Sequence, residues 1–572
     1  MSQEHLDRLT AIDASFLHQE GPNSHMHVGA LTMFEGPPPP YTEVLDTLRG
    51  RLHLVPRYRQ RLTVPPAGTG RPLWVDDASF SLEYHVRHTA LPHPGSEQQL
   101  LLLAGRIFSQ QLDRSKPLWE VWMVEGLADG GFALITKTHH ALIDGIAGVD
   151  IAQVIFDLGP VPAEVPHPDE AWEPAPTPTG AQVLASGTLD LLRTGVRTAA
   201  AAASLATRPK EALRSARVAV EGLEDNRFAL ITKTHHALID GIAGVDIAQV
   251  IFDLTPVPAE VPHPDEAWAP APEPSGAQLL ASGTMGLLRT GVRTADAAAA
   301  LATRPTQALR SAREAVEGLG EVAWAGLNPA PATPLNVEIG PHRRFLVVRN
   351  ELADFKAVKD VFGGTVNDVV LTVVSGALRT WLHSRGVRTE GMELRALVPV
   401  SIRAQDERGT TGNRIAAMRG PLPVYIEDPV ARLRAVKVAM DGLKESKQAV
   451  GAEVLASVQN FAPPTILAQA SRLNFSTRLF NLIVTNIPGP QFPLYVRGRE
   501  MLDVFPVAFL PKDHALAVAI MSYHGRMNFG LLGDYDALRD LDVIGEGIEA
   551  SLAELLALAR RRSLAQRSPA GV

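Results

Sequence analysis

The stretch that decides the fold is Phe132-Ala-Leu-Ile-Thr-Lys-Thr-His-His-Ala-Leu-Ile-Asp-Gly145. The same residues occur again from Phe228 to Gly241. Each copy begins with an apolar and β-branched run that is typical of a strand. Each copy then carries a His-His pair followed, after three residues, by Asp-Gly. A histidine held at the end of a strand can act as a general base near neutral pH, because its unperturbed pKa is about 6.5. The motif therefore predicts acid–base chemistry at two alternative places in the chain.

The repeat is one long block present twice. Residues 132–158 are identical to residues 228–254, and the similarity continues to about residues 222 and 318 at a constant offset. A solenoid would need about three or more short repeats to bury a shared core. Removing one block of 96 residues from 572 leaves a chain of 476 residues. We interpret this shorter chain as the ancestral protein, altered by a tandem duplication or by an error of gene assembly.

Composition limits the class of protein. A chain of 572 residues is too long for one hydrophobic core, so we expect two domains and an insertion. The absence of cysteine excludes a disulfide scaffold, thiolate metal sites and cysteine nucleophiles. A net charge of −8 provides no general attraction to nucleic acid, and we expect no nucleic-acid partner.

The first residues lack the basic start and apolar core of a signal peptide, which favours a cytoplasmic protein. No apolar run reaches the roughly 18 residues that span a bilayer, so we expect any contact with the inner membrane face or with lipid inclusions to be peripheral. Basic, apolar stretches at residues 193–217 and 560–562 are candidate contacts. For the Ala-rich segments 181–223 and 277–319 we favour a helical linker over a lipid-bound helix.

Periodicity predicts the elements of the N-terminal part. We expect a strand at residues 27–34, a helix at 41–54, and a hairpin of 119–127 with 132–138 around Ala128-Asp-Gly-Gly131. A second helix is expected at 98–112, with its inner side formed by Leu101, Leu102, Ala104, Ile107 and Phe108. Pro-rich stretches at 160–178 and 256–274 are too rich in proline for regular structure.

The C-terminal part mixes strands and helices. We expect strands at residues 345–348, 397–402, 482–485, 515–522 and 527–533, and helices at 352–361, 367–379, 430–443 and 541–559. This mixed order indicates α/β layers. The predicted domains are 1–158 with the first motif, a linker at 159–227, the second copy at 228–323, and a C-terminal domain at 324–572.

Further stretches elsewhere in the chain accompany the motif. His139-His140-x-x-x-Asp144-Gly145 resembles the signature of the CoA-dependent acyltransferase superfamily. With it occur Met26-His-Val-Gly29, Pro117-Leu118-Trp119, Asn367-Asp368, Val398-Pro-Val-Ser-Ile-Arg403, Gly412-Asn-Arg414 and Thr485-Asn-Ile-Pro-Gly-Pro490. Together they are similar to the bacterial wax ester synthase/diacylglycerol acyltransferase family. The resemblance covers nearly the whole chain apart from the extra copy.

This resemblance implies an α/β fold of two chloramphenicol-acetyltransferase-like domains that share a channel with the motif at its middle. It implies transfer of a long-chain acyl group from acyl-CoA to diacylglycerol, to a long-chain alcohol, or to both. No cofactor is implied, because acyl-CoA is a substrate. Two alternatives stay open: an acyltransferase of the same fold that uses a non-lipid acceptor, and a non-catalytic lipid-binding protein.

The resemblance makes His140 the general base that takes the proton from the acceptor hydroxyl. Adjacent strand residues point to opposite faces, so we assign His139 a role in supporting the geometry. Asp144 is expected to be structural, as a helix N-cap or as the partner of an arginine, and Gly145 to relieve backbone crowding. A metal site formed by His139, His140 and Asp144 is disfavoured, because adjacent histidines on a strand diverge.

Other motif residues are expected around the substrate. The resemblance places Asn367 and Asp368 at the domain interface, while the local pattern also allows Asn367 or Thr365 to cap a helix. We expect Pro117, Leu118 and Trp119 to form a wall of the substrate channel. Asn486 belongs to a rigid turn near the cleft.

Chain connectivity favours the first copy as the working one. If the second copy occupied the central strand, the hairpin loop would grow from about four to about one hundred residues, at a cost of about 3 kcal/mol. Local hairpins also form early during synthesis. We therefore predict that His140 is the active base and that His236, its equivalent, is surplus. The surplus copy would expose apolar residues and promote aggregation.

Overall fold

The computed structural model describes residues 7–9, 11–65, 71–142, 156–157, 159–162, 172–175, 178, 217–223, 227–232, 329–401, 415–445 and 475–567. The chain divides into two compact units. The larger unit comprises residues 1–191, 317–400 and 416–572, and the smaller one residues 192–316 and 401–415. Asp144, Gly145, His236 and most of the predicted linker and second copy lie outside the described residues.

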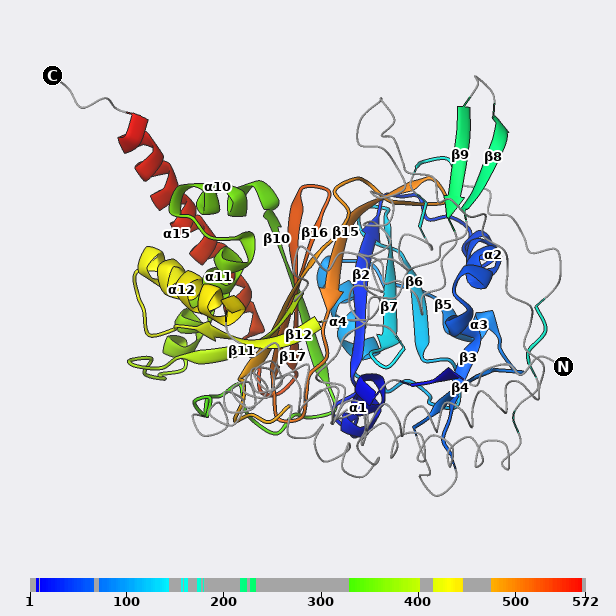
Figure 1. Ribbon diagram of the computed structural model, residues 1–572, viewed down its shortest axis with the longest axis horizontal. Helices are drawn as coiled ribbons and strands as arrows, with labels where there is room; N and C mark the ends of the chain where they lie inside the picture. The colour runs from blue at the N-terminus through cyan, green and yellow to red at the C-terminus, as the bar shows by residue number, and fades with distance from the viewer. Residues whose placement is uncertain are drawn as a thin grey trace, which may run out of the picture. The chain divides into compact units, whose positions relative to one another are not determined.

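The motif strand is central in a six-stranded sheet of the larger unit (Figure 1). The strand order is β14 (Tyr495–Val496), β15 (Arg499–Val507), β2 (His27–Phe34), β7 (Phe132–His139), β6 (Trp119–Glu125) and β5 (Val86–Ala90). β7 runs antiparallel to both of its neighbours, β2 and β6. The predicted β6–β7 hairpin is therefore confirmed.

The two faces of β7 are covered by different helices. Ala133 and Ile135 belong to the same buried cluster as the apolar side of α4 (Glu97–Phe108). Phe132 and Leu134 pack in a second cluster with α2 (Tyr41–Arg51). Successive side chains of a strand point to opposite faces, so the alternation places one helix on each side of the sheet.

A second six-stranded sheet carries the C-terminal part. Its order is β10 (Arg343–Glu351), β17 (Arg526–Asp534), β16 (Leu516–Tyr523), β13 (Leu482–Pro488), β11 (Leu394–Ser401) and β12 (Ile415–Leu422). Four helices lie along one side of it in Figure 1: α10 (Leu352–Phe362), α11 (Val366–Ser384), α12 (Pro429–Glu445) and α15 (Leu541–Arg567). The predicted C-terminal strands and helices are all present, but α11 and α15 continue beyond their expected ends at residues 379 and 559.

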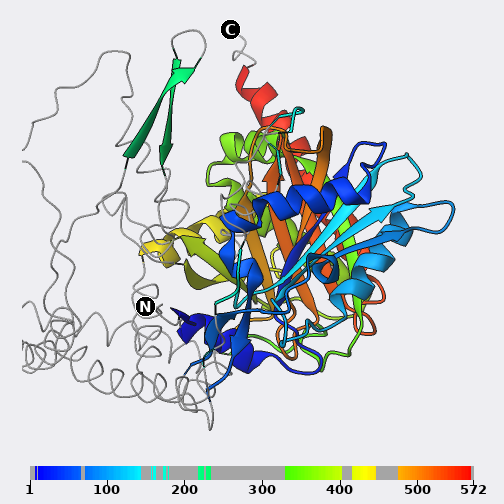
Figure 2. The same cartoon turned by 90° about the vertical axis from the view of Figure 1, so that its right-hand side faces the viewer.

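β15 joins the two sheets. It follows the C-terminal strand β13 in the chain, yet it pairs antiparallel with β2 of the N-terminal sheet. It also contacts β16 and β17, and Figure 2 shows these strands side by side. A Cβ at Gly530 of β17 would lie 2.0 Å from the carbonyl oxygen of Pro506 in β15. Only glycine permits so close an approach of the two backbones.

The remaining elements are small. A three-stranded sheet contains β1 (Asp7–Arg8), β4 (Leu73–Asp76) and β3 (Gln60–Thr63). Short helices are α1 (Ala11–Gln19), α3 (Leu82–His85), η1 (Leu52–Leu54) and η2 (Pro56–Arg59). In the smaller unit β8 (Arg217–Leu223) and β9 (Arg227–Thr232) form an antiparallel pair.

Among the described helices, none is by itself long and apolar enough to cross a membrane. α10 and α11 meet this criterion only when they are taken together, and they are bent by 101° relative to each other.

Candidate active site

The end of the motif strand is held from both sides. His139, the last residue of β7, lies opposite His27 of β2. Its backbone N–H donates to the carbonyl oxygen of Leu118 at 3.0 Å, and the N–H of His140 donates to the carbonyl oxygen of Met26 at 3.0 Å. Two of the stretches noted in the sequence, Met26-His-Val-Gly29 and Pro117-Leu118-Trp119, thus fix the backbone of the histidine pair.

Both ring nitrogens of His139 have protein neighbours. Nδ1 accepts the backbone N–H of Ala141 at 3.0 Å. A neutral imidazole that accepts at Nδ1 carries its proton on Nε2, and Nε2 lies 3.4 Å from Glu20 Oε2, an ion-pair distance. The side chain is fully buried. His139 is therefore enclosed by protein groups, and its Nδ1 supports the turn that follows.

Glu20 is a buried carboxylate at the centre of this arrangement, with 1% of its side chain exposed. Arg114 donates through Nε to Glu20 Oε2 at 2.7 Å. His27 Nε2 lies 3.8 Å from the other carboxylate oxygen. Burial alone would raise the pKa of Glu20, but His139 and Arg114 outweigh it, and the pKa lies below its ordinary value. Glu20 is therefore ionised at neutral pH.

Two further histidines adjoin this carboxylate. Burial lowers the pKa of His27 well below its ordinary value, and the charge of Lys137 acts in the same direction. Burial also lowers the pKa of His25, against the effect of a 2.8 Å contact between its Nε2 and the carbonyl oxygen of Pro22. Both imidazoles are thus neutral at pH 7.

His140 has different surroundings. Its ring stacks on Phe16 of α1, with centroids 4.0 Å apart and planes inclined by 18°. Phe509 meets the ring edge-on at 5.5 Å. Phe475 lies 5.8 Å from Phe509 and 6.3 Å from Phe16, so aromatic rings from three separate segments gather beside the half-buried His140. This apolar setting suits a hydrocarbon chain beside His140.

The other predicted residues are dispersed over the larger unit. Leu118 is fully buried, and Trp119 is 2% exposed between the rings of Tyr58 and His85. These residues support the motif strand, and their role as a channel wall stays a prediction. The prediction that Asn486 belongs to a rigid turn is wrong, because Asn486 lies within β13, in register with Ile520 of β16.

The Asn-Asp pair lies in the first turn of α11. Thr365, not Asn367, is the N-cap of this helix. The Thr365 side chain accepts the Asp368 N–H, and Asp368 Oδ2 accepts the Thr365 N–H at 2.7 Å. Asp368 is buried and completes a capping box. Its position explains a structural role, while the interface role of Asn367 stays a prediction.

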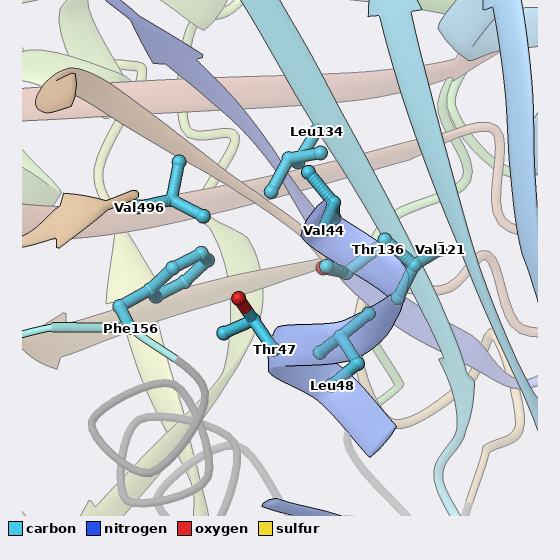
Figure 3. A pocket seen from close by; sticks show the side chains of 8 residues that line it. All are labelled: Val44, Thr47, Leu48, Val121, Leu134, Thr136, Phe156 and Val496. Carbon is cyan, nitrogen blue, oxygen red and sulfur yellow. The ribbon is translucent and has the colours of Figure 1, made fainter. Parts of the chain in front are cut away.

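A small apolar cavity lies on the other side of the N-terminal sheet. Its lining residues come mainly from α2, β6 and β7, and Figure 3 shows them: Val44, Thr47, Leu48, Val121, Leu134, Thr136, Phe156 and Val496. Leu134 and Thr136 alternate with Lys137 and His139 along β7, so the cavity opens on the face opposite His139. It is not part of the histidine site. Within the described ranges, no three His, Asp or Glu side chains are grouped to hold a metal ion.

Comparison with known proteins decides the family. The profile of the wax ester synthase/diacylglycerol acyltransferase catalytic domain matches residues 9–220 and again 215–370, and the profile of the C-terminal domain of the same family matches residues 411–556. The chain belongs to this family. The predicted membership is confirmed, and with it the class of activity, an O-acyltransferase.

Curated relatives agree over the full length. A probable diacylglycerol O-acyltransferase of Mycobacterium tuberculosis is 30% identical over 566 residues, covering 98% of each chain. A second probable diacylglycerol O-acyltransferase of that species is 28% identical, covering 96% of this chain and 99% of the relative.

Solved structures confirm the predicted fold. The wax ester synthase/diacylglycerol acyltransferase from Marinobacter aquaeolei VT8 matches with a TM-score of 0.56 and 24% identity, over 96% of this chain and 99% of that one. The first condensation domain of the calcium-dependent antibiotic synthetase matches with a TM-score of 0.52 and 16% identity, over 97% of each chain. The two α/β halves are therefore those of a CoA-dependent acyltransferase fold.

Several residues around the histidine pair carried no signal in the sequence. Glu20, Arg114, Phe16 and Phe509 belong to none of the stretches that resemble the family motifs. His27 lay inside Met26-His-Val-Gly29, but nothing in that stretch predicted its contact with Glu20. A single buried carboxylate becomes recognisable only when folding brings its partners to it.

Proposed function

We propose that this chain transfers a long-chain acyl group from acyl-CoA to the hydroxyl group of diacylglycerol or of a long-chain alcohol, with His140 as the general base. The observation that carries the choice of base is the contrast within the histidine pair. His139 is fully buried, and both of its nitrogens face protein groups. His140 is half-buried at the end of β7, among aromatic rings.

The step is a direct transfer. The acceptor oxygen attacks the thioester carbonyl carbon while its proton passes to the imidazole of His140. The carbon–sulfur bond breaks, the ester forms, and the proton returns to the sulfur of the leaving CoA. Positioned base catalysis of this kind typically contributes about 10²–10⁴ in rate. The chain contains no cysteine, so no acyl group passes through an enzyme thiol.

Release of CoA thiol from palmitoyl-CoA tests this proposal. The full chain is assayed with diacylglycerol, with hexadecanol, and with small polar alcohols and amines. Release with the lipid acceptors that depends on His140 is the expected result. Release only with small polar acceptors would assign a non-lipid acceptor, and retained lipid binding without any turnover would assign a non-catalytic lipid-binding protein.

We further propose that the protein is cytoplasmic and binds peripherally to the inner membrane face or to lipid inclusions. The proposed acceptors dissolve in lipid. At the end of α15, Arg560, Arg561 and Arg562 are exposed and are followed by Leu564, which is 67% exposed. Basic residues beside an apolar one suit an anionic lipid surface. Protein that stays bound to membranes after high-salt and carbonate washes would contradict a peripheral mode.

A further inference from the structure

The C-terminal end of α1 contacts both motif histidines. Phe16 lies in the last two turns of this helix, and Glu20 follows its last residue. The N–H of Glu20 donates to the carbonyl oxygen of Phe16 at 3.1 Å, so the two residues are one helical turn apart and lie on the same side. The Phe16 ring stacks on His140, and the Glu20 carboxylate faces His139.

We propose that Phe16 and Glu20 form a clip that positions the catalytic histidine, and that Glu20 is a positioning residue for His140 acting through His139. The inference rests on the proposed function, because it assigns a role in the same reaction. It adds residues that no motif of the chain contains.

The contacts form a continuous path from Glu20 to the base. The Glu20 carboxylate lies 3.4 Å from Nε2 of His139, and Nδ1 on the other side of the ring is an acceptor. Nδ1 receives the N–H of Ala141, and the carbonyl oxygen of His139 receives the N–H of Leu142 at 2.9 Å. These two bonds define the turn that contains His140. Rotation of the His139 ring would remove one of them and release the turn.

The clip is anchored on its outer side. Arg114 donates to Glu20 Oε2 and also to the carbonyl oxygen of Leu17 at 2.9 Å. Ala14 and Leu17 of α1 belong to one buried cluster with Leu118 and Ala141. The helix end therefore has a fixed position relative to the motif turn, which a positioning role requires.

Burial indicates that the charge of Glu20 is needed. A buried carboxylate is costly unless it is paired. Arg114 pairs only with Oε2 of Glu20, and the carboxylate also faces His139 and His27 on two adjacent strands. In the same way, a buried carboxylate orients the catalytic histidine of serine proteases. Here the oriented ring is the neighbour of the proposed base.

The test is a steady-state comparison of Glu20→Gln with the wild type, using palmitoyl-CoA and the better lipid acceptor. Glu20→Gln keeps the shape and removes the charge. We expect kcat to fall about 10- to 100-fold, as when the outer partner of a functional histidine is lost. KM for palmitoyl-CoA should stay within about twofold of the wild type, because the Glu20 side chain is only 1% exposed. Glu20→Asp, which keeps the charge, should recover part of the loss.

Glu83→Gln is the matched control. Glu83 lies exposed on α3 and is paired with Arg49 of α2 at 3.0 Å. The same chemical change there should leave kcat and KM unchanged. Thermal midpoints are recorded for every variant. A loss of activity in Glu20→Gln that follows the loss of folded protein, with unchanged kcat per folded molecule, would overturn the clip.

Phe16→Leu covers the case in which the Glu20 variants fail to fold. It keeps apolar volume at the helix end and removes the ring stack, and we expect kcat to fall about 2- to 10-fold. Wild-type kcat in this variant would overturn the clip. If His140→Ala is inactive while Glu20→Gln and Phe16→Leu are normal, only the clip is wrong. If the wild-type chain transfers no acyl group, both the clip and the proposed function are wrong.

Discussion

The hairpins β6–β7 and β8–β9 have the same register and different surroundings. Val124 lies opposite Ala133 in the first, and Val220 lies opposite Ala229 in the second, at the constant offset of 96 residues. The first hairpin is flanked by β2 and β5 in a six-stranded sheet. The second forms a sheet of two described strands. Local sequence therefore specifies the hairpin, and the partners on either side decide whether it becomes part of a core.

The comparison bears on function because a hairpin alone cannot assemble the site. His139 and His140 are held by four residues that lie outside the duplicated block: Leu118, Met26, Glu20 and Phe16. An isolated two-stranded sheet is marginally stable in water at best. The motif segment that lies between β2 and β6 has these neighbours.

Replacing the second histidine of each motif copy by alanine tests this contrast most severely. His140→Ala should lower kcat by at least about 10²-fold, because it removes a positioned general base. His236→Ala should leave kcat largely intact. CoA release with a lipid acceptor measures both. The reverse result would mean that the second copy occupies the site, and equal partial losses would mean that both arrangements are populated.

The fold was largely predictable because its elements are short and strongly patterned. The β6–β7 hairpin follows from a Gly-rich turn between two β-rich runs, and α11 from a long apolar segment after Thr365. The inner side of α4 was partly wrong, since Leu102 is 59% exposed while Leu100 and Leu103 are buried. Four consecutive leucines contain no periodicity from which a face can be chosen.

What the sequence did not predict depends on contacts distant along the chain. β15 was not among the predicted strands, and it is tertiary packing that pairs it with β2. Glu20 is a lone acidic residue in the sequence, and its partner Arg114 lies 94 residues away. The motif identified the two histidines, but it could not say that one of them is enclosed and the other left beside the aromatic rings.

Truncation of an isoleucine common to both hairpins should sharpen the comparison. Ile135 of β7 is fully buried in the main core, so Ile135→Ala should destabilise the protein by about 2–5 kcal/mol. Ile231→Ala makes the same change at the equivalent position of β9, and we expect a much smaller effect on the main unfolding transition. Urea unfolding measures both variants. Equal shifts would show that both hairpins contribute to one core.

Two buried histidines, His27 at the start of β2 and His25 just before it, predict a smaller effect on stability. His25 and His27 have pKa values lowered by burial, so they bind fewer protons in the folded chain than in the unfolded one. Stability should be full above pH about 6.5 and fall as the pH decreases below that value. Glu20, with its lowered pKa, adds a second loss below pH about 4.5.

Thermal midpoints between pH 8 and pH 5 measure the first of these losses. His27→Gln should flatten the curve in this range, because glutamine does not titrate there. An unchanged slope in that variant would show that other groups cause the acid sensitivity.

Deleting residues 228–323 should have the smallest effect on catalysis. The deletion leaves 476 residues, keeps β2, β6 and β7 with all described neighbours of His140, and removes β9. Because those neighbours lie outside the deleted segment, specific activity should equal that of the full chain. Solubility should rise, since the deletion removes a surplus copy of an apolar segment. CoA release per folded molecule and the soluble fraction after expression measure the two effects.

Deletion of residues 132–227 is the matched experiment, since it leaves an identical motif segment after β6 and should restore the same sheet through the second copy. If both shortened chains are active, the identity of the copy is irrelevant and its position between β2 and β6 is what matters. A shortened chain that folds with the first copy in place and yet transfers no acyl group would remove His140 from the proposed mechanism.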